Sequence, residues 1–176
     1  MKYSIIAAYQ LVDGGIGYNG NLPWPPLKND MDYFKSVTMS TVDSSKMNSV
    51  VMGRLTWESL PRKPLPNRLN IVISNTMTHV PGAFVFPSLC SALKFISDES
   101  SLVENTYVIG GQRLFEEAIQ DPNCNKLYLT EIKCLQTDFQ SDTFFPINKL
   151  MHFVETYSSD LNAENNLLYR YRVLER

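Results

Sequence analysis

Hydrophobic and polar residues alternate in short runs along most of the chain, and segments with helical spacing lie between these runs. The short runs predict eight strands: Tyr3–Tyr9, Ser49–Met52, Leu69–Ser74, Ala83–Phe86, Thr106–Ile109, Lys126–Ile132, His152–Ser158 and Leu167–Leu174. The helical spacing predicts four helices: Lys28–Met39, Thr56–Leu60, Ser88–Ile96 and Gln112–Ile119. Strands that alternate with helices favour an α/β sheet with parallel crossovers.

The end of the chain departs from this alternation, because no helix separates the last two predicted strands. We expect the segment from Asn162 to Asn166 to join them as a long turn, which indicates an antiparallel hairpin. The stretch from Pro61 to Pro66 is predicted to be a loop, since proline removes backbone donors. The expected fold is a single α/β domain over residues 1–176. Its mostly parallel twisted sheet has about eight strands and a C-terminal antiparallel hairpin, flanked by four helices.

Composition and charge narrow the function classes. A chain of 176 residues suits one domain with a sizeable core. The net charge is -2 and no basic run occurs, so nothing indicates a nucleic-acid partner. No apolar run reaches the roughly 18 residues that a membrane span needs. The N-terminus lacks the features of a signal peptide, so we expect a cytoplasmic location.

The sequence contains only three cysteines and two histidines. Cys90, Cys124 and Cys134 form no C-x-x-C pair, and neither histidine has metal-ligand spacing from them, so we expect free thiols and no metal. The nucleophile elbow, the phosphate-binding P-loop and the H-E-x-x-H zinc motif do not occur in the sequence. Hydrolysis by a triad or by zinc is therefore not indicated.

Half of the eight glycines lie between Gly14 and Gly20, where Gly15-Ile16-Gly17-Tyr18-Asn19-Gly20 matches the dinucleotide fingerprint. The fingerprint requires a helix to begin at its last glycine. Here Asn21-Leu22-Pro23-Trp24-Pro25-Pro26 follows, and this segment cannot be helical. We favour a mobile loop that closes over a site, with Leu22 and Trp24 as its apolar cover. A plain surface loop is the alternative.

The first predicted helix carries one carboxylate on an otherwise apolar face. Four positions share that face at helical spacing: Leu27, Asp30, Met31 and Phe34. A buried unpaired carboxylate is costly, so Asp30 needs a partner. Asp30 either favours the helix dipole or pairs with Lys28 or Lys35, or else it recognises a ligand with paired N–H donors. The spacing leaves these explanations open.

Two strand-to-helix turns carry glycine beside arginine, at Met52-Gly53-Arg54 and at Ile109-Gly110-Gly111-Gln112-Arg113. Glycine at such a turn leaves backbone N–H groups free to meet an anion, and Arg54 and Arg113 add positive charge. Glycine also occurs at such turns for packing alone. The two turns therefore suggest a dinucleotide site without requiring one.

Several short segments occur in one order along the chain: Leu22-Pro23-Trp24, Asp30, Phe34, Met52-Gly53-Arg54-Leu55-Thr56-Trp57, Leu60-Pro61, Arg68-Leu69-Asn70, Ser74, Ile109-Gly110-Gly111 and Asp142-Thr143-Phe144-Phe145-Pro146. With this ordered set the chain resembles the dihydrofolate reductase family, from about Ser4 to the C-terminal strands. The resemblance implies a monomer that uses NADPH to reduce 7,8-dihydrofolate to tetrahydrofolate, for one-carbon metabolism and thymidylate synthesis. Such enzymes are inhibited by antifolates.

The resemblance also implies roles for catalytic and substrate-binding residues. Asp30 would bind the pteridine and favour its protonation through solvent, with Thr130 in support, while Leu22 and Trp24 would hold the water involved. Arg68 would clamp the glutamate α-carboxylate of the substrate, a task suited to a guanidinium. The remaining substrate-binding residues implied by the resemblance are Ile5, Ile6, Met31, Phe34, Lys35, Leu60, Leu65 and Ile109.

For NADPH, the resemblance implies three groups of contacts. The nicotinamide would be lined by Ala7, Gly15, Ile16, Gly17, Gly20 and Asn21. The phosphates would be held by Gly53, Arg54, Leu55 and Thr56 and by Gly110, Gly111, Gln112, Arg113, Leu114 and Phe115. The rest of the cofactor would contact Ile73, Ser74, Asn75, Ile109 and Thr143, with Arg54 and Ser74 at the 2′-phosphate. The Gly110-Gly111 peptide is expected to be cis, and Lys63-Pro64 also.

Three departures from the family pattern and two rival functions complete the expectations. Asn75 stands where many eukaryotic members have a basic residue, Met31 replaces an aromatic residue of many vertebrate members, and the segment from Gln10 to Gly15 is slightly longer than usual. The rivals are a pyrimidine reductase of riboflavin synthesis with the same fold and a non-catalytic NADPH- or folate-binding protein. Asp30 and Arg68 argue against the first rival, and the intact set of matched positions argues against the second.

Overall fold

The computed structural model describes residues 1–176 and contains a nine-stranded sheet in the order β10-β11-β7-β1-β6-β3-β4-β5, with β9 paired to β11. The strands of this sheet are β1 (Tyr3–Gln10), β3 (Met47–Gly53), β4 (Arg68–Ile73), β5 (Phe84–Phe86), β6 (Val103–Val108), β7 (Cys124–Cys134), β9 (Val154–Ser158), β10 (Asn162–Glu164) and β11 (Leu167–Glu175). A separate small sheet pairs β2 (Gly15–Gly17) with β8 (Thr143–Phe144). The helices are α1 (Lys28–Met39), α2 (Arg54–Ser59), α3 (Leu89–Asp98), α4 (Gln112–Ala118) and the 3₁₀ helix η1 (Ile147–His152).

The strand directions confirm the predicted fold class. The strands from β7 through β1, β6, β3 and β4 to β5 pair in parallel, while β11 pairs antiparallel with β7, β9 and β10. The predicted long turn over 162–166 is wrong in its length, because Asn162–Glu164 forms β10. Only Asn165 and Asn166 make the turn, at φ 51° and 60°. Asparagine adopts such left-handed backbone more readily than most residues, which suits a two-residue hairpin turn.

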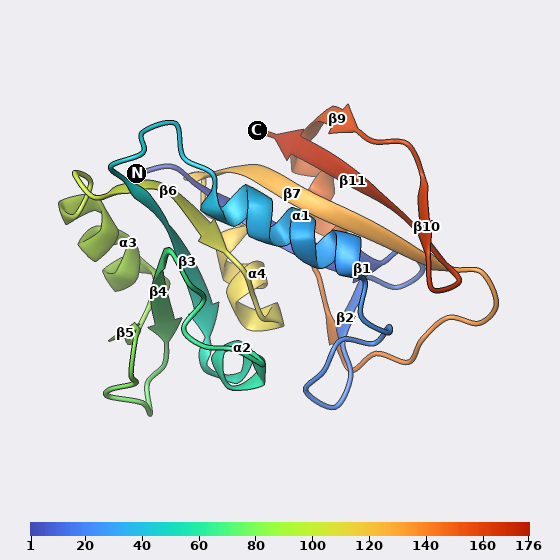
Figure 1. The fold of residues 1–176 in the computed structure, drawn as a ribbon, viewed down its shortest axis with the longest axis horizontal. Coiled ribbons are helices and arrows are strands. Elements are labelled where there is room, and N and C mark those ends of the chain that lie inside the picture. Colours follow the sequence, from blue (N-terminus) through green and yellow to red (C-terminus); the bar gives the residue numbers. More distant parts are fainter.

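The two largest of three hydrophobic clusters lie on opposite faces of the sheet. One contains side chains of α3 and α4, and the other packs against α1 and α2. In Figure 1, α1 crosses in front of the sheet and α4 lies behind it. Because successive side chains of a strand point to opposite faces, β1 contributes Ile5 to the α4 side and Ile6 to the α1 side.

The glycine-rich segment is more regular than the predicted loop. Gly15–Gly17 is strand β2, and an Asn19-Gly20 turn follows it at φ 49° and 78°. A Cβ on Gly15 would lie 2.0 Å from Ser141 Oγ, so the glycine permits close contact with the segment leading into β8. No helix follows Gly20, which confirms that the fingerprint match does not form a dinucleotide-binding turn.

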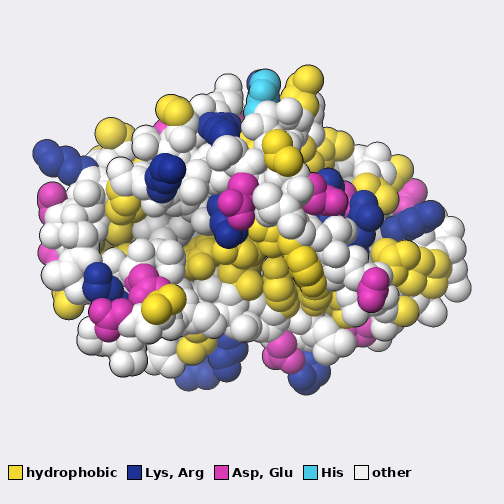
Figure 2. Space-filling view, turned by 90° about the horizontal axis from the view of Figure 1, so that it is seen from above, with side chains coloured by type: hydrophobic (Ala, Val, Ile, Leu, Met, Phe, Trp, Pro, Cys, Tyr) yellow, Lys and Arg dark blue, Asp and Glu magenta, His cyan; other side chains and the backbone are white.

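Other features of the chain agree with the expectations. Lys63-Pro64 and Gly110-Gly111 are both cis, and all three cysteines are unpaired. No helix combines the length and apolar character needed to cross a membrane. Figure 2 shows charged side chains of both signs interspersed on one face, with hydrophobic side chains gathered in its middle. An anionic ligand must therefore be attracted by local charge, because the net charge is -2.

Candidate active site

Asp30 lies in the first turn of α1, half-buried against the sheet. Its Oδ1 accepts a hydrogen bond of 2.7 Å from Thr130 Oγ1 on β7. Burial raises the pKa of the Asp30 carboxyl above its ordinary value of 3.8, the Thr130 hydrogen bond partly opposes this shift, and the charge of Glu164 adds to it. The carboxylate is thus held by a hydroxyl and not by a cation.

The ion-pair explanation for Asp30 is wrong. Lys28 Nζ lies 2.7 Å from Asp32 Oδ2, one turn further along the exposed side of α1. Lys35 is exposed and makes no ion pair. Asp30 does occupy the first turn, where the helix dipole favours a negative charge. That position does not compensate for burial, since the pKa is still raised.

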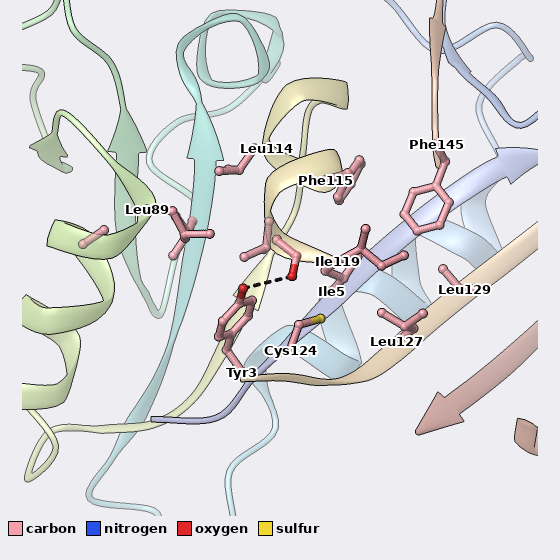
Figure 3. Close-up of a cluster of buried hydrophobic side chains, with 14 of the residues drawn as sticks. Tyr3, Ile5, Leu89, Leu114, Phe115, Ile119, Cys124, Leu127, Leu129 and Phe145 are labelled. Atoms are coloured by element: carbon pink, nitrogen blue, oxygen red, sulfur yellow. Dashed lines mark hydrogen bonds between the residues drawn. The ribbon is translucent and has the colours of Figure 1, made fainter. Parts of the chain in front are cut away.

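Apolar side chains surround the same region of α1. Four of the predicted substrate-binding residues pack against the core cluster that contains Ile6: Phe34, Leu60, Leu65 and Ile109. Met31 is 55% exposed, so it is free to contact a ligand. Ile5 is different, because its side chain lies in the opposite core beside Phe115 and Leu127, as Figure 3 shows. The role of Ile5 in substrate binding stays a prediction, and Ile6 is the β1 side chain on the α1 side.

The predicted apolar cover divides into a fixed part and an exposed part. Trp24 is 4% exposed and packs with Leu27 and with side chains of β7 and β11. Leu22 is 55% exposed. Trp24 consequently forms a packed wall beside the start of α1. Leu22 remains available as a cover.

Arg68 is a buried cation without an anionic partner. Its side chain is at the start of β4, and the residue is 8% exposed. Nε donates to Pro66 O at 3.0 Å, and a terminal nitrogen donates to Thr38 Oγ1 at 2.8 Å. Burial lowers the pKa of Arg68, although an arginine stays charged at neutral pH. The remaining donors of the guanidinium suit a carboxylate.

Sequence reasoning missed Thr38, which orients Arg68. Its hydroxyl donates to Phe34 O at 2.8 Å within α1 and accepts from Arg68. A threonine in a helix commonly makes this bond to the carbonyl four residues earlier, so the spacing from Phe34 was a usable signal. The contact with Arg68 spans 30 positions and had no such local signal.

The two glycine turns lie side by side at the carboxyl ends of β3 and β6. Gly53 N donates to Gly110 O at 2.8 Å, which joins the turns directly. Gly53 and Gly111 precede α2 and α4, and neither helix has a side-chain cap. Because the first backbone N–H groups of a helix have no partner within it, those of α2 and α4 can bind a ligand. A Cβ added at Gly53 would meet Gly110 O and Gly111 N at 3.8 Å, an ordinary van der Waals contact, so the second turn packs closely against Gly53.

The charges at these turns are unequal. Arg54 lies 2.9 Å from Glu58 Oε1, and both side chains are more than two-fifths exposed. Arg113 is exposed and makes no ion pair. Leu114 and Phe115 are buried in the core, so only their backbone groups are candidates for a phosphate contact.

Several of the other predicted cofactor residues already make contacts within the protein. Ala7 and Ile16 pack at the border of the α4-side core. Gln112 accepts a hydrogen bond from Phe144 N at 2.8 Å, and Thr143 pairs with Gly17 across the small sheet. Ser74 Oγ already accepts from Met77 N at 3.0 Å. Thr56 and Asn75 make no side-chain hydrogen bond, and Asn21 Nδ2 donates to Asn19 O at 3.4 Å. Gly20, Leu55 and Ile73 have no side-chain donor or acceptor.

Another hollow lies elsewhere on the molecule. A cavity of about 470 Å³ is lined by Ile119, Gln120, Lys149, His152 and Arg176, and none of these is a predicted site residue. No group of three or more His, Cys, Asp or Glu side chains is placed to hold a metal ion. The site chemistry is therefore concentrated around Asp30, Arg68 and the glycine turns.

These features define a class of protein. Ligand-binding turns at the carboxyl ends of parallel strands are typical of open α/β enzymes. Here such turns accompany a half-buried carboxylate beside apolar side chains and no nucleophile–base pair, an arrangement suited to a reductase that binds a nucleotide and a small heterocyclic substrate.

Comparison with known proteins identifies the family. Residues 2–176 match the family model described as dihydrofolate reductase. The dihydrofolate reductase of Heliothis virescens is 41% identical over 187 residues, covering 100% of this chain and 98% of that protein. The Mus musculus enzyme is 38% identical, over 92% of this chain and 91% of its own. The solved Schistosoma mansoni dihydrofolate reductase superposes with a TM-score of 0.86 at 34% identity, covering 99% of this chain and 98% of that one. The chain belongs to the dihydrofolate reductase family.

Proposed function

We propose that the protein reduces 7,8-dihydrofolate to 5,6,7,8-tetrahydrofolate with NADPH. The observation that carries the proposal is Asp30, a half-buried carboxylate without a cationic partner, bonded to Thr130 and flanked by an apolar wall. A protein gains nothing in stability from such a group, so its presence beside an apolar wall points to ligand recognition. The pyrimidine reductase alternative has no comparable support.

The glycine turns fit NADPH. They offer adjacent backbone N–H groups at the starts of α2 and α4 and the unpaired charge of Arg113. Bound NADPH supplies a hydride to C6 of dihydrofolate while N5 takes a proton from solvent, so NADP⁺ and tetrahydrofolate are released. Selection of the 2′-phosphate rests on Arg54 and Ser74. In this structure Arg54 pairs with Glu58, and Ser74 Oγ accepts from Met77 N. Binding of the 2′-phosphate must share or replace these contacts.

Asp30 acts on the pterin without forming a covalent bond. Its carboxylate accepts hydrogen bonds from the pterin amino group and ring nitrogen, and Thr130 fixes its orientation. The negative charge, in an apolar and largely dry position, favours the protonated pterin over the neutral one. The packed indole of Trp24 limits solvent at this end of the site.

Arg68 binds the other end of the substrate. Its guanidinium is held by Thr38 and Pro66 and has donors left for the glutamate α-carboxylate of dihydrofolate. Pairing with that anion would offset the cost of burying Arg68. Met31, Phe34, Leu60 and Ile109 enclose the aromatic part of the substrate.

An NADPH-oxidation assay tests the proposal against the non-catalytic alternative. We expect oxidation that requires dihydrofolate, that stops when an antifolate is added, and that yields tetrahydrofolate in equal amount. Tight binding of NADPH and dihydrofolate without turnover would support a binding protein instead. Activity only with a pyrimidine precursor of riboflavin would support the related reductase. Monomeric state and cytoplasmic location stay predictions, checked by sedimentation and by imaging a tagged chain.

A further inference from the structure

The helix that carries Asp30 does not cap its own N-terminus. Leu27 occupies the cap position and has no side chain able to accept a hydrogen bond from the first turn. The first backbone N–H groups of any helix lack partners inside the helix, and exposed or unsatisfied groups there weaken the first turn. Asp30 is the third residue of α1, so its position depends directly on that turn.

The C-terminal hairpin supplies the missing cap. Glu164 of β10 accepts from Lys28 N at 2.8 Å through Oε1 and from Asn29 N at 3.4 Å through Oε2. Two further contacts join the hairpin to the segment around the start of α1. Asn165 Nδ2 in the turn donates to Pro26 O at 3.0 Å, and Tyr171 OH on β11 donates to Asn29 O at 3.3 Å. Figure 1 shows β10 and the start of α1 at the same end of the molecule.

The cap is also a charge near the Asp30 carboxylate. Burial is the main cause of the raised pKa of Asp30, and the negative charge of Glu164 raises it further. The other groups that face Asp30 are the Thr130 hydroxyl and the phenols of Tyr33 and Tyr171. Both phenols are neutral at physiological pH, since burial raises the pKa of Tyr33 to about 12 and that of Tyr171 further.

The cations near the first turn do not cancel Glu164. Lys28 is fully exposed and its ammonium group pairs with Asp32, which raises the pKa of Lys28, with a smaller contribution from Glu164. Lys35 is exposed and unpaired on the same helix. Glu164 therefore acts on Asp30 as a carboxylate whose hydrogen bonds go to the backbone of the helix itself.

We propose that Glu164 is a positioning residue for the pterin site, which fixes the first turn of α1 and thereby sets where the Asp30 carboxylate lies and how much negative charge it meets. The inference rests on the proposed role of Asp30 in dihydrofolate reduction. It gives the β10–β11 hairpin, 136 positions away in sequence from the helix it caps, a part in tuning that site. Glu164 does not touch the substrate.

Three variants separate the charge of Glu164 from its capping bonds. Glu164→Gln keeps the size and an acceptor oxygen but removes the charge, and Glu164→Ala removes both. Asp160→Asn is the matched control, because it removes one negative charge from the segment leading into the same hairpin and Asp160 is exposed with no side-chain hydrogen bond. Titration of ¹³C-labelled aspartate carboxyls by NMR reports the pKa of Asp30, and the pH profile of NADPH oxidation reports its effect.

We expect Glu164→Gln to lower the pKa of Asp30. We also expect the decline of turnover at alkaline pH to begin at a lower pH than in wild type. We expect Glu164→Ala to add a roughly two- to five-fold rise in the KM for dihydrofolate, the equivalent of a lost helix cap. Asp160→Asn should change neither. The inference is overturned if the pKa of Asp30 is the same in Glu164→Gln as in Asp160→Asn. This holds even if Glu164→Gln has a lower melting temperature than wild type. If wild-type protein oxidises no NADPH with dihydrofolate, the proposed function fails, while the carboxyl titration still decides the role of Glu164.

Discussion

Two carboxylates on opposite faces of β7 lie in opposite electrostatic settings: Asp30, which is bonded to Thr130, and Glu131, the next residue of the strand. On the α1 side, Thr130 donates to Asp30, which has no cationic partner and a raised pKa. On the other face, Glu131 accepts from Tyr9 at 2.8 Å, from Arg170 at 2.8 Å and from Arg172 at 2.6 Å. Burial opposes the ionisation of Glu131, but these partners outweigh it and its pKa falls below 4.5.

The difference separates a structural charge from a functional one. Glu131 has every partner it needs inside the protein, so its hydrogen bond to Tyr9 and its ion pairs with Arg170 and Arg172 join β1, β7 and β11 and leave nothing for a ligand. Asp30 has one hydroxyl partner, and Arg68 is a buried cation with no anion. Groups of this kind cost stability in the free protein and gain their partners when a ligand binds. The two carboxylates should therefore respond to substitution in opposite ways.

Asp30→Asn is expected to have the largest effect. The amide keeps the shape and the acceptor for Thr130 but cannot favour a protonated pterin, so turnover at pH 7 should fall roughly 10²- to 10⁴-fold and recover partly at acid pH. Steady-state kinetics across pH measure this loss, with Asp32→Asn on the exposed side of α1 as the control. Full activity of Asp30→Asn at pH 7 would remove Asp30 from the mechanism.

The stability of the same variant should not fall. Because the folded-state pKa of Asp30 lies above its ordinary value, ionisation of Asp30 costs folding free energy as the pH rises above about 3.8. Asp30→Asn removes that cost, so urea unfolding at pH 7 should give an equal or larger free energy of unfolding than wild type. A marked loss of stability would show that Asp30 is a structural residue.

Glu131→Gln should behave in the opposite way. Removing one partner of the buried network is expected to cost about 3 kcal/mol of unfolding free energy at pH 7 while turnover per folded molecule stays within about two-fold. The folded-state pKa of Glu131 is lowered, so its contribution is present above 4.5 and is lost as the pH falls through the lower folded value. Urea unfolding at several pH values should show the two proteins converging in acid. A constant difference at all pH values would contradict the assignment.

Arg68→Ala is expected to act on substrate binding. Loss of hydrogen bonds to a charged carboxylate should raise the KM for dihydrofolate roughly 10- to 100-fold with a smaller effect on kcat. Arg68→Lys should fall between wild type and Arg68→Ala, because lysine keeps the charge but not the paired donors. Arg62→Ala, at an exposed loop position, is the control. An unchanged KM in Arg68→Ala would exclude the proposed clamp.

The smallest effect is expected at Arg54, a cation that already has a partner. Its exposed pair with Glu58 means that Arg54→Ala should raise the KM for NADPH roughly two- to five-fold. Glu58→Gln should lower that KM slightly, since it frees Arg54 for the 2′-phosphate. The comparison of NADPH with NADH in both variants measures the preference. Equal effects on the two cofactors would show that Arg54 does not read the 2′-phosphate.

The sequence predicted the elements well because hydrophobic spacing reports local geometry. All four helices and the eight predicted strands appear; α1 has its predicted bounds, and the other elements have ends shifted by a few residues. The short pairing of Gly15–Gly17 with Thr143–Phe144 was missed, since glycine has no side chain to show alternation and the partner lies far along the chain. Ile5 and Ile6 are equally apolar, so alternation predicted opposite faces but not which face held the site.

The site was only partly predictable. Spacing put Asp30 on an apolar helix face but could not choose between an ion pair and a ligand, because Lys28 is near in sequence and pairs elsewhere. Thr130 and Arg68 were found only through the ordered family resemblance. The cap from Glu164 and the support from Thr38 depend on contacts across the fold, and no local pattern carries that information.

Titration of both carboxyls in one sample tests the central contrast most directly. Wild-type protein labelled with ¹³C at the aspartate and glutamate carboxyls, with Asp30→Asn and Glu131→Gln to assign the two signals, gives both pKa values under identical conditions. The account predicts that Asp30 titrates above 3.8 and Glu131 below 4.5 in the free protein. An Asp30 value at or below its ordinary one would show that the protein already compensates that charge, and the distinction between the two faces of β7 would be lost.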